Sequence, residues 1–205
     1  MRRLFPVLAN FGVANGITTL GVVFGFVGIL SASHGALRVA VTFLFGAILC
    51  DRLDGRIAYL LNEQSDFGGH LDSLSDGLSL CLFPAYLGYQ LGLASPVSVA
   101  VLSLFLLAGL WRLADFNLAG VVVRNNRSYF RGIPTTVAAG WLLVAISVVM
   151  HVGGPAARLG LLGVFAVSTV LMISAVLYPK EGPATKVLHL AVPLGVLLVW
   201  LPPLN

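Results

Sequence analysis

Acidic side chains are concentrated in one short part of this sequence. Six of the eight acidic residues lie between positions 51 and 76 of the 205-residue chain, within an otherwise mostly apolar region. An ionised carboxylate inside an apolar helix is costly, so such groups usually face a cavity and a charged partner. The only basic residues in this region are Arg52 and Arg56, too few to pair with the carboxylates. A bound cation is therefore the natural partner for the cluster.

The spacing of four aspartates indicates two acidic stripes on neighbouring helices. Asp51 and Asp54 are three positions apart, and Asp72 and Asp76 are four apart, so each pair shares one helix face. The turn between the two helices, at residues 62–66, is short, which makes them a hairpin. Oxygen ligands suit Mg²⁺, Mn²⁺ or Ca²⁺ rather than zinc. Four carboxylates carry enough charge for two divalent ions, an arrangement that recurs in phosphoryl transfer.

Two classes of function remain open on these residues alone. Intramembrane acids occur in cation-binding transporters and structural cation sites as well as in enzymes. A transporter is expected to have broken helices at matching positions in two symmetric halves. Here the acids are confined to one hairpin, which favours an enzyme.

Composition places this hairpin in a polytopic membrane protein. Hydrophobic residues make up 58% of the chain and charged residues 10%, with a mean hydropathy of +0.97. A soluble domain is about 25% charged, so a soluble globular enzyme is excluded, and disorder requires low hydrophobicity. The net charge of +4 fits membrane topology and anionic headgroups rather than nucleic acid. Cys50 and Cys81 lie in apolar stretches and are expected to be core residues without a disulfide.

Seven apolar stretches predict an all-α transmembrane bundle of six to seven spans, in one integral membrane domain covering residues 1–205. The last stretch is short and ends in two prolines, so it either spans or is only partly inserted. Residues 1–11 are expected to form an N-terminal interfacial helix. The seven stretches are 13–32, 36–61, 66–92, 97–120, 134–152, 156–177 and 186–201.

Basic residues are distributed unequally between the two sides of this bundle. One side has only Arg38 and Arg158, whereas seven basic residues fall on the side of the N-terminus and of the acidic hairpin's turn. The positive-inside rule therefore places the N-terminus and the acidic site on the cytoplasmic side of the cell membrane. The seven residues are Arg2, Arg3, Arg124, Arg127, Arg131, Lys180 and Lys186.

The acidic region resembles the signature of the CDP-alcohol phosphatidyltransferase family. Residues 51–76 read DRLDGRIAYLLNEQSDFGGHLDSLSD, and the family pattern is D-x2-D-G-x2-A-R-x8-G-x3-D-x3-D. The departure is Tyr59, where the family has an arginine that helps to bind the nucleotide-lipid donor. A tyrosine cannot make a bidentate guanidinium contact to phosphate, which leaves that charge to Arg56 or Arg112. The seven positions that match are Asp51, Asp54, Gly55, Ala58, Gly68, Asp72 and Asp76.

The resemblance implies a mechanism with two metal ions. Asp51, Asp54, Asp72 and Asp76 would hold two divalent ions, Mg²⁺ or Mn²⁺, which bind the diphosphate of a CDP-lipid such as CDP-diacylglycerol. Asp76 would also be the general base for an acceptor hydroxyl, which attacks the lipid-linked phosphorus and releases CMP. An N-x2-T element beside the cytidine and the S-x-FG run complete the expected donor site. Its residues are Asn15, Thr18, Gly55, Ala58, Tyr59, Ser65 and Gly68.

Further runs are similar to the phosphatidylserine synthase branch of the family, namely WRLADFN at 111–117 and YFRGIP at 129–134. They imply serine as the acceptor, although Asp115 replaces an arginine of that branch, and inositol phosphate, glycerol phosphate and choline remain open. Arg112 could instead pair with Asp115, three positions on. Besides donor and acceptor, membrane lipids are expected partners, and a homodimer is left open. The expected contacts to acceptor or phosphate are Arg112, Asn117 and Arg131.

Overall fold

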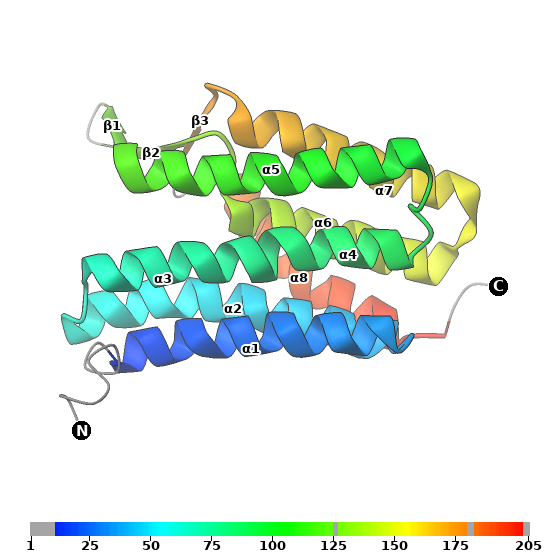
Figure 1. Cartoon of the computed structure of the whole chain (residues 1–205), viewed down its shortest axis with the longest axis horizontal. Helices are drawn as coiled ribbons and strands as arrows, with labels where there is room; N and C mark the ends of the chain where they lie inside the picture. The colour runs from blue at the N-terminus through cyan, green and yellow to red at the C-terminus, as the bar shows by residue number, and fades with distance from the viewer. Residues whose placement is uncertain (1–10, 125–126, 180–182, 203–205) are drawn as a thin grey trace.

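The computed structural model describes residues 11–124, 127–179 and 183–202, and within them it is a bundle of long helices with one small sheet (Figure 1). The interfacial helix expected at residues 1–11 lies almost entirely outside the described residues. The helices are α1 (Val13–Ser33), α2 (Leu37–Leu61), α3 (Asp66–Asp76), η2 (Gly77–Leu82), α4 (Phe83–Gln90), α5 (Pro96–Ala119), α6 (Thr135–Val152), α7 (Gly154–Ile173) and α8 (Pro183–Trp200). The strands are β1 (Val122–Arg124), β2 (Arg127–Arg131) and β3 (Leu177–Pro179).

The predicted membrane bundle is confirmed. Four helices, α1, α5, α6 and α7, are long and apolar enough to cross a bilayer. The helix α2 contains Asp51, Arg52 and Asp54 near its C-terminal end, which explains why it is less apolar than those four. Each of the seven predicted stretches coincides with one helical rod. The predicted sixth stretch, 156–177, extends beyond its helix, since α7 ends at Ile173 and residues 177–179 form β3.

The third rod contains a π-helical segment directly after the last aspartate of the signature. The residues at both junctions, Asp76 and Leu82, keep right-handed helical dihedrals, so α3, η2 and α4 are continuous. Pro84 follows within the first turn of α4 and cannot donate a helical hydrogen bond. The wider π turn lies just before this proline. Short π-helical segments of this kind are frequent at functional sites.

Three glycines of α1, Gly21, Gly25 and Gly28, pack against this third rod. A Cβ at Gly21 would lie 3.3 Å from Cys50 Cβ and 3.4 Å from Ser75 Oγ, and one at Gly28 would collide with the Phe83 ring. Ser79 Oγ donates to the Gly21 carbonyl at 3.0 Å. Small residues thus let α1 approach the rod closely enough for interhelical hydrogen bonds.

The three-stranded antiparallel sheet was not predicted from the sequence. The β1–β2 pair is local, with Val122 opposite Tyr129, but β2 also pairs with β3, where Phe130 lies opposite Tyr178. The sheet occupies the same end of the molecule as the α2–α3 turn and the start of α1 (Figure 1). It therefore caps the end where the acidic residues lie.

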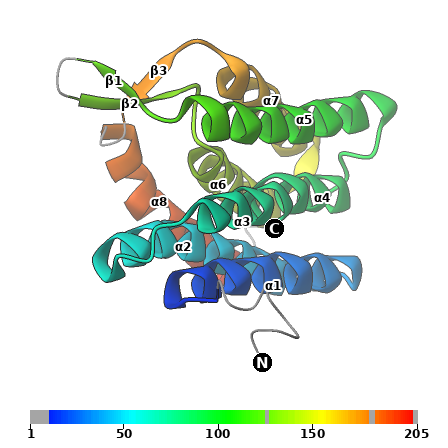
Figure 2. The same ribbon diagram turned by 60° about the vertical axis from the view of Figure 1, so that its left-hand side comes forward.

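The remaining helices complete the bundle around α6. The helix α7 packs against α5, where the rings of Phe105 and Phe165 meet edge to face with their centres 5.1 Å apart. The helix α8 crosses beside α6 and α2 (Figure 2). Trp200 of α8 donates its indole N–H to Thr42 of α2 at 3.2 Å. Because the described chain passes along the bundle seven times, its N-terminal and C-terminal ends lie at opposite ends of the bundle (Figure 1).

Candidate active site

Three carboxylates from two antiparallel helices converge. One oxygen from each of Asp51, Asp72 and Asp76 lies within 4.8 Å of the others. Asp76 is buried, whereas Asp51 and Asp72 are half-buried. The convergence follows from the two helical stripes predicted from the sequence, because the turn at 62–65 folds α3 back along α2. We call these three residues the aspartate cluster.

Asp54, the fourth predicted ligand, is not part of the aspartate cluster but lies beside it. Its Oδ2 accepts a hydrogen bond from Thr18 Oγ1 at 2.6 Å, and its Oδ1 accepts one from the Gly55 amide at 2.6 Å. It is buried, and it lines a cavity together with Asp51 and Asp72. The structure thus gathers three of the four predicted ligands and ties the fourth to α1.

The donor set of the aspartate cluster fits a metal ion. The hydrogen bonds to it come from neutral hydroxyls, Thr136 to Asp51 and Thr135 to Asp76, both at 2.7 Å. Within the part of the chain that the structure describes, no ion pair joins the cluster to a basic side chain. Carboxylates this close repel one another unless a cation or a proton offsets their charge. Oxygen donors alone favour a hard cation, so these residues could hold one.

A cavity of about 290 Å³ opens beside the cluster between α1, α2 and the start of α3. Its floor includes Asp51, Asp54 and Asp72. Six of the seven predicted donor contacts line it: Asn15, Thr18, Gly55, Ala58, Ser65 and Gly68. We call this space the first cavity.

Glycine shapes the first cavity in two ways. A Cβ at Gly55 would meet nothing within 4 Å, so the absence of a side chain there leaves open space along α2. A Cβ at Gly68 would instead lie 3.0 Å from Asn15 Oδ1 and 3.2 Å from Ser65 Oγ. Gly68 therefore allows α3 to approach α1, and its amide donates to the Ser65 cap at 3.1 Å.

The turn between α2 and α3 also fixes the beginning of α1. Asn62 adopts a left-handed conformation (φ 55°), and the Glu63 amide donates to the Ala58 carbonyl at 2.9 Å, which is a Schellman ending of α2. This ending directs the Glu63 side chain to α1, where its Oε2 accepts the Ala14 amide hydrogen at 2.9 Å. The cap residue Gly12 has no side chain for that purpose. Glu63 thus caps the helix that carries Asn15, a role that the sequence analysis missed.

A second cavity, of about 720 Å³, lies on the other side of the aspartate cluster. It shares Asp51, Gly55 and Asp72 with the first cavity and also reaches Asp76. Tyr59, the seventh predicted donor contact, is 70% exposed and lines this second cavity instead. Further lining comes from α2 and α3 and, across the cavity, from α5, the sheet and α6. The residues contributed by these last three elements include Arg112, Phe116, Phe130, Thr135 and Thr136.

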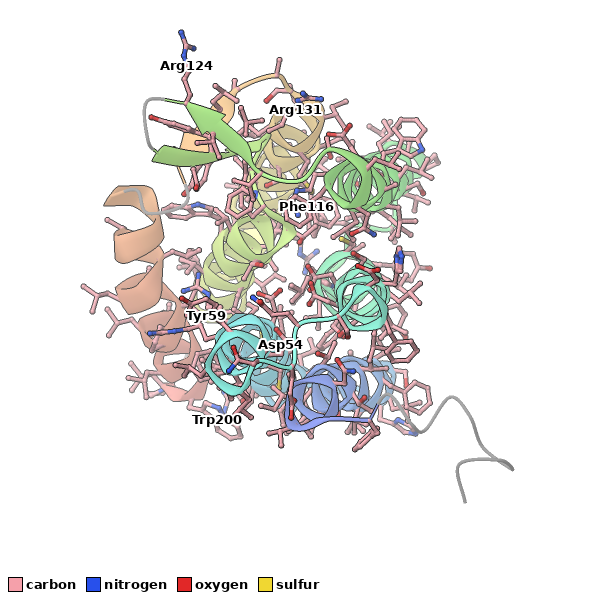
Figure 3. All side chains as sticks on the ribbon, turned by 90° about the vertical axis from the view of Figure 1, so that its left-hand side faces the viewer. Asp54, Tyr59, Phe116, Arg124, Arg131 and Trp200 are labelled. Atoms are coloured by element: carbon pink, nitrogen blue, oxygen red, sulfur yellow. The ribbon has the colours of Figure 1, made fainter. Side chains whose placement is uncertain are left out.

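Arg112 is the buried cation of the second cavity. It is 8% exposed, and its guanidinium carbon lies 5.2 Å from the Phe116 ring centre and 5.7 Å from that of Phe130. Its Nη1 donates to Thr135 Oγ1 at 3.5 Å, and its Nε has no partner among the described residues. A buried guanidinium with an unused N–H is suited to bind an anion. Figure 3 looks onto this end, with Phe116 across from Asp54 and Tyr59.

The other two predicted acceptor contacts lie outside both cavities. Asn117 accepts a hydrogen bond from Ser73 at 3.0 Å, which ties α5 to α3. Arg131 Nη1 lies 3.7 Å from Asp115 Oδ1, with both side chains about half exposed. Asp115 therefore pairs with Arg131 rather than with Arg112, which corrects the pairing considered from the i, i+3 spacing. Arg131 is the last residue of β2, the central strand of the sheet (Figure 3).

Thr135 and Thr136 were not identified from the sequence. They follow the YFRGIP run directly, and two adjacent hydroxyls at the start of an apolar helix were the available signal. Their place depends on Gly132 (φ 68°), where a Cβ would collide with the Met172 carbonyl of α7. The Gly132 amide donates to the Val176 carbonyl at 2.9 Å and the Ile133 amide to the Leu171 carbonyl at 3.2 Å, so the end of α7 and the segment after it hold the turn that starts α6.

Comparison with known proteins agrees with this geometry. Residues 11–197 match the family profile of the CDP-alcohol phosphatidyltransferases. The chain is 35% identical to a CDP-diacylglycerol–serine O-phosphatidyltransferase of Saccharomyces cerevisiae over 148 residues, 65% of this chain and 54% of that protein. It is 32% identical to the protein of that name from Helicobacter pylori (strain J99) over 186 residues, 85% of this chain and 75% of the relative. For the Methanocaldococcus jannaschii protein of the same name, the identity is 29% over 97% of this chain and 89% of the relative. The chain is therefore a member of the CDP-alcohol phosphatidyltransferase family.

Proposed function

We propose that this membrane enzyme transfers the phosphatidyl group of a CDP-diacylglycerol-type lipid to the hydroxyl of L-serine and releases CMP. The observation that carries the proposal is that the aspartate cluster lies between two cavities: Asp51 and Asp72 line both, and Asp76 lines the second. A transfer between two substrates requires the phosphorus and the attacking oxygen to meet at one place. The names of the relatives support serine as the acceptor.

In this proposal the first cavity binds the cytidine diphosphate part of the donor. Asn15, Thr18 and Gly68 line it beside the cluster, and the bare backbone at Gly55 leaves room for a flat ligand. The lipid tails stay in the bilayer, since the cavity lies near one end of the bundle. Two divalent ions, Mg²⁺ or Mn²⁺, would neutralise the diphosphate and the leaving CMP when bound. The residues proposed to hold them are Asp51, Asp54, Asp72 and Asp76.

The second cavity would bind serine. The buried Arg112, with its unpartnered Nε, is proposed to contact the serine carboxylate. Asp76 would accept the hydroxyl proton as the serine oxygen attacks the lipid-linked phosphorus, and the P–O bond to CMP breaks with its electron pair on CMP. Arg56 lines this cavity close to Tyr59 and is proposed to supply the charge of the missing signature arginine. Asn117 and Arg131 would act only through neighbouring residues, because neither lines the cavity.

The decisive assay follows CMP release by the purified protein in lipid–detergent micelles. CDP-diacylglycerol is offered with serine, inositol phosphate, glycerol phosphate or choline, each with Mg²⁺ or Mn²⁺. We expect serine to exceed the others by at least tenfold. A preference for another alcohol would refute the acceptor assignment, and the absence of CMP release with every alcohol would refute the proposed function.

Arg112 is tested in the same assay against a matched arginine. Arg112→Gln removes a charged hydrogen bond, a loss of about 1.5–3 kcal/mol, so KM for serine should rise by about tenfold or more. KM for the donor should change little. Arg131→Gln is the control, since Arg131 lies outside both cavities. Equal effects of the two substitutions would contradict the assignment of Arg112.

We further propose that the N-terminus and the site face the cytoplasm at the plasma membrane. Arg124 and Arg131 lie at the site end, whereas Arg38 and Arg158 start helices at the opposite end. Arg124→Cys and Arg38→Cys should therefore be labelled by an impermeant thiol reagent from opposite sides of the membrane. The native Cys50 and Cys81 are buried and give little background. A homodimer would be tested by the mass of the solubilised particle.

A further inference from the structure

Two adjacent threonines at the start of α6 hold two aspartates that come from different helices. Thr136 Oγ1 donates to Asp51 Oδ2 of α2, and Thr135 Oγ1 donates to Asp76 Oδ2 of α3, both at 2.7 Å. Thr135 is 1% exposed. The first turn of α6 is thus the element that joins the two halves of the aspartate cluster from outside the hairpin.

Like Thr18, whose hydroxyl donates to Asp54 Oδ2, these threonines donate to a carboxylate of another helix. Three other helical threonines donate within their own helix instead. Thr19, Thr42 and Thr169 each donate to the carbonyl four residues earlier in their own helix. A threonine in a helix interior commonly does so. At the first two positions of α6 the carbonyl four residues earlier lies outside the helix, so the hydroxyl protons of Thr135 and Thr136 are available to the aspartates.

Thr135 also stands between Asp76 and Arg112. Its single proton goes to Asp76, and a lone pair of the same oxygen accepts from Arg112 Nη1 at 3.5 Å. Within the described residues Arg112 makes no ion pair with the cluster. A direct pair would tie the guanidinium to Asp76 and remove both from the reaction. The intervening hydroxyl instead separates Asp76 from Arg112, whose Nε has no partner among the described residues.

We propose that Thr135 and Thr136 are positioning residues with separate tasks: Thr136 orients Asp51 for metal binding, and Thr135 orients Asp76 while separating it from Arg112. This inference rests on the proposed function for its catalytic part, because it takes Asp76 as the base and Arg112 as the acceptor contact. Its geometric part concerns only the carboxylates and can be measured without turnover.

The experiment compares valine and serine substitutions in the full-length solubilised protein. Valine keeps the β-branched shape and removes the hydroxyl, whereas serine restores the hydroxyl. Thr169→Val is the matched control on α7, since its hydroxyl bonds only to its own helix among the described contacts. Three quantities are measured for each variant: kcat, KM for serine and for the CDP-lipid, and Mn²⁺ affinity from the electron paramagnetic resonance of free Mn²⁺.

Different outcomes are expected for the two threonines. Thr136→Val should weaken Mn²⁺ binding by about tenfold, the loss of one hydrogen bond to a charged group, while kcat at saturating Mn²⁺ changes little. Thr135→Val should lower kcat by about 10- to 100-fold even at saturating Mn²⁺ and raise KM for serine more than KM for the CDP-lipid. The serine variants should recover most of each loss.

Three results would overturn the inference: valine variants that resemble Thr169→Val, serine variants that fail to recover, or identical effects of both valines on every quantity. Failure of the proposed function looks different. In that case the wild-type protein releases no CMP with serine, yet Thr136→Val still weakens Mn²⁺ binding relative to Thr169→Val. If the Mn²⁺ affinities of these two variants also agree, the positioning role of Thr136 is refuted on its own.

Discussion

Replacement of Glu63 by alanine should weaken binding of the CDP-lipid and leave the chemical step largely intact. The Glu63 carboxylate accepts the Ala14 amide hydrogen at 2.9 Å and so caps α1, because the cap residue Gly12 has no side chain. Asn15 and Thr18 follow within the next turn and line the first cavity. Without the cap, the donor must order this turn when it binds.

The size of the effect follows from the capping contact. A side-chain cap contributes about 0.5–2 kcal/mol, and a negative charge at a helix N-terminus contributes about 0.3–1 kcal/mol. Because Glu63 is half-buried, a loss of about 1–2 kcal/mol is expected, which corresponds to a rise in KM of about 5- to 30-fold. Glu63→Gln keeps an acceptor oxygen and loses only the charge, so its KM should rise by about 2- to 5-fold.

The assay measures KM for CDP-diacylglycerol from CMP release at saturating serine. Asp66→Asn is the control, since Asp66 is an exposed acid of the same hairpin, at the first position of α3. Gly12→Ala provides an independent route to the same change, because its Cβ would lie 2.7 Å from Glu63 Oε2 and displace the carboxylate. The Gly12→Ala/Glu63→Ala double variant should then have a KM for CDP-diacylglycerol no higher than that of the weaker-binding single variant. A fall in kcat at unchanged donor KM, or additive losses in the double variant, would refute the reasoning.

The remaining predictions concern the metal, the base, the signature departure and the bundle. Excess EDTA should abolish CMP release and Mn²⁺ should restore it; full turnover in EDTA would contradict a metal site at the aspartate cluster. Asp76→Asn should retain CDP-lipid binding, measured by isothermal titration, while CMP release stops; equal loss of both would make Asp76 a ligand only. Tyr59→Arg should leave KM for the CDP-lipid nearly unchanged, because Arg56 is proposed to supply the charge of the missing arginine; a fall in KM of about tenfold, the value of a charged hydrogen bond, would show that Arg56 does not have that role. Gly28→Leu should lower the thermal midpoint, since even a Cβ there collides with Phe83 and overpacking costs about 1–3 kcal/mol; an unchanged midpoint would show that α1 can shift.

The amino-acid sequence by itself determined the helical bundle and the acidic stripes. A bilayer requires long apolar segments whose backbone bonds are satisfied internally, so hydropathy alone locates the helices. Within one hairpin, the helical repeat then decides which residues share a face, and the structure brings together Asp51, Asp72 and Asp76, three of the four predicted ligands.

Contacts between distant segments were decided only by the tertiary structure. Thr136 and Asp51 are 85 positions apart, and Glu63 and Ala14 are 49 apart, so no local pattern relates them. Strand β3 has only three residues, too few to show an alternating pattern, and it pairs with β2 although α6 and α7 separate the two strands in the sequence. Asp51 and Asp54 are both aspartates on one face of α2, yet Asp54 accepts a hydrogen bond from a hydroxyl of α1, whereas Asp51 accepts one from a hydroxyl of α6. Helical spacing fixes the direction of a side chain, but its partner depends on which helices pack against that face.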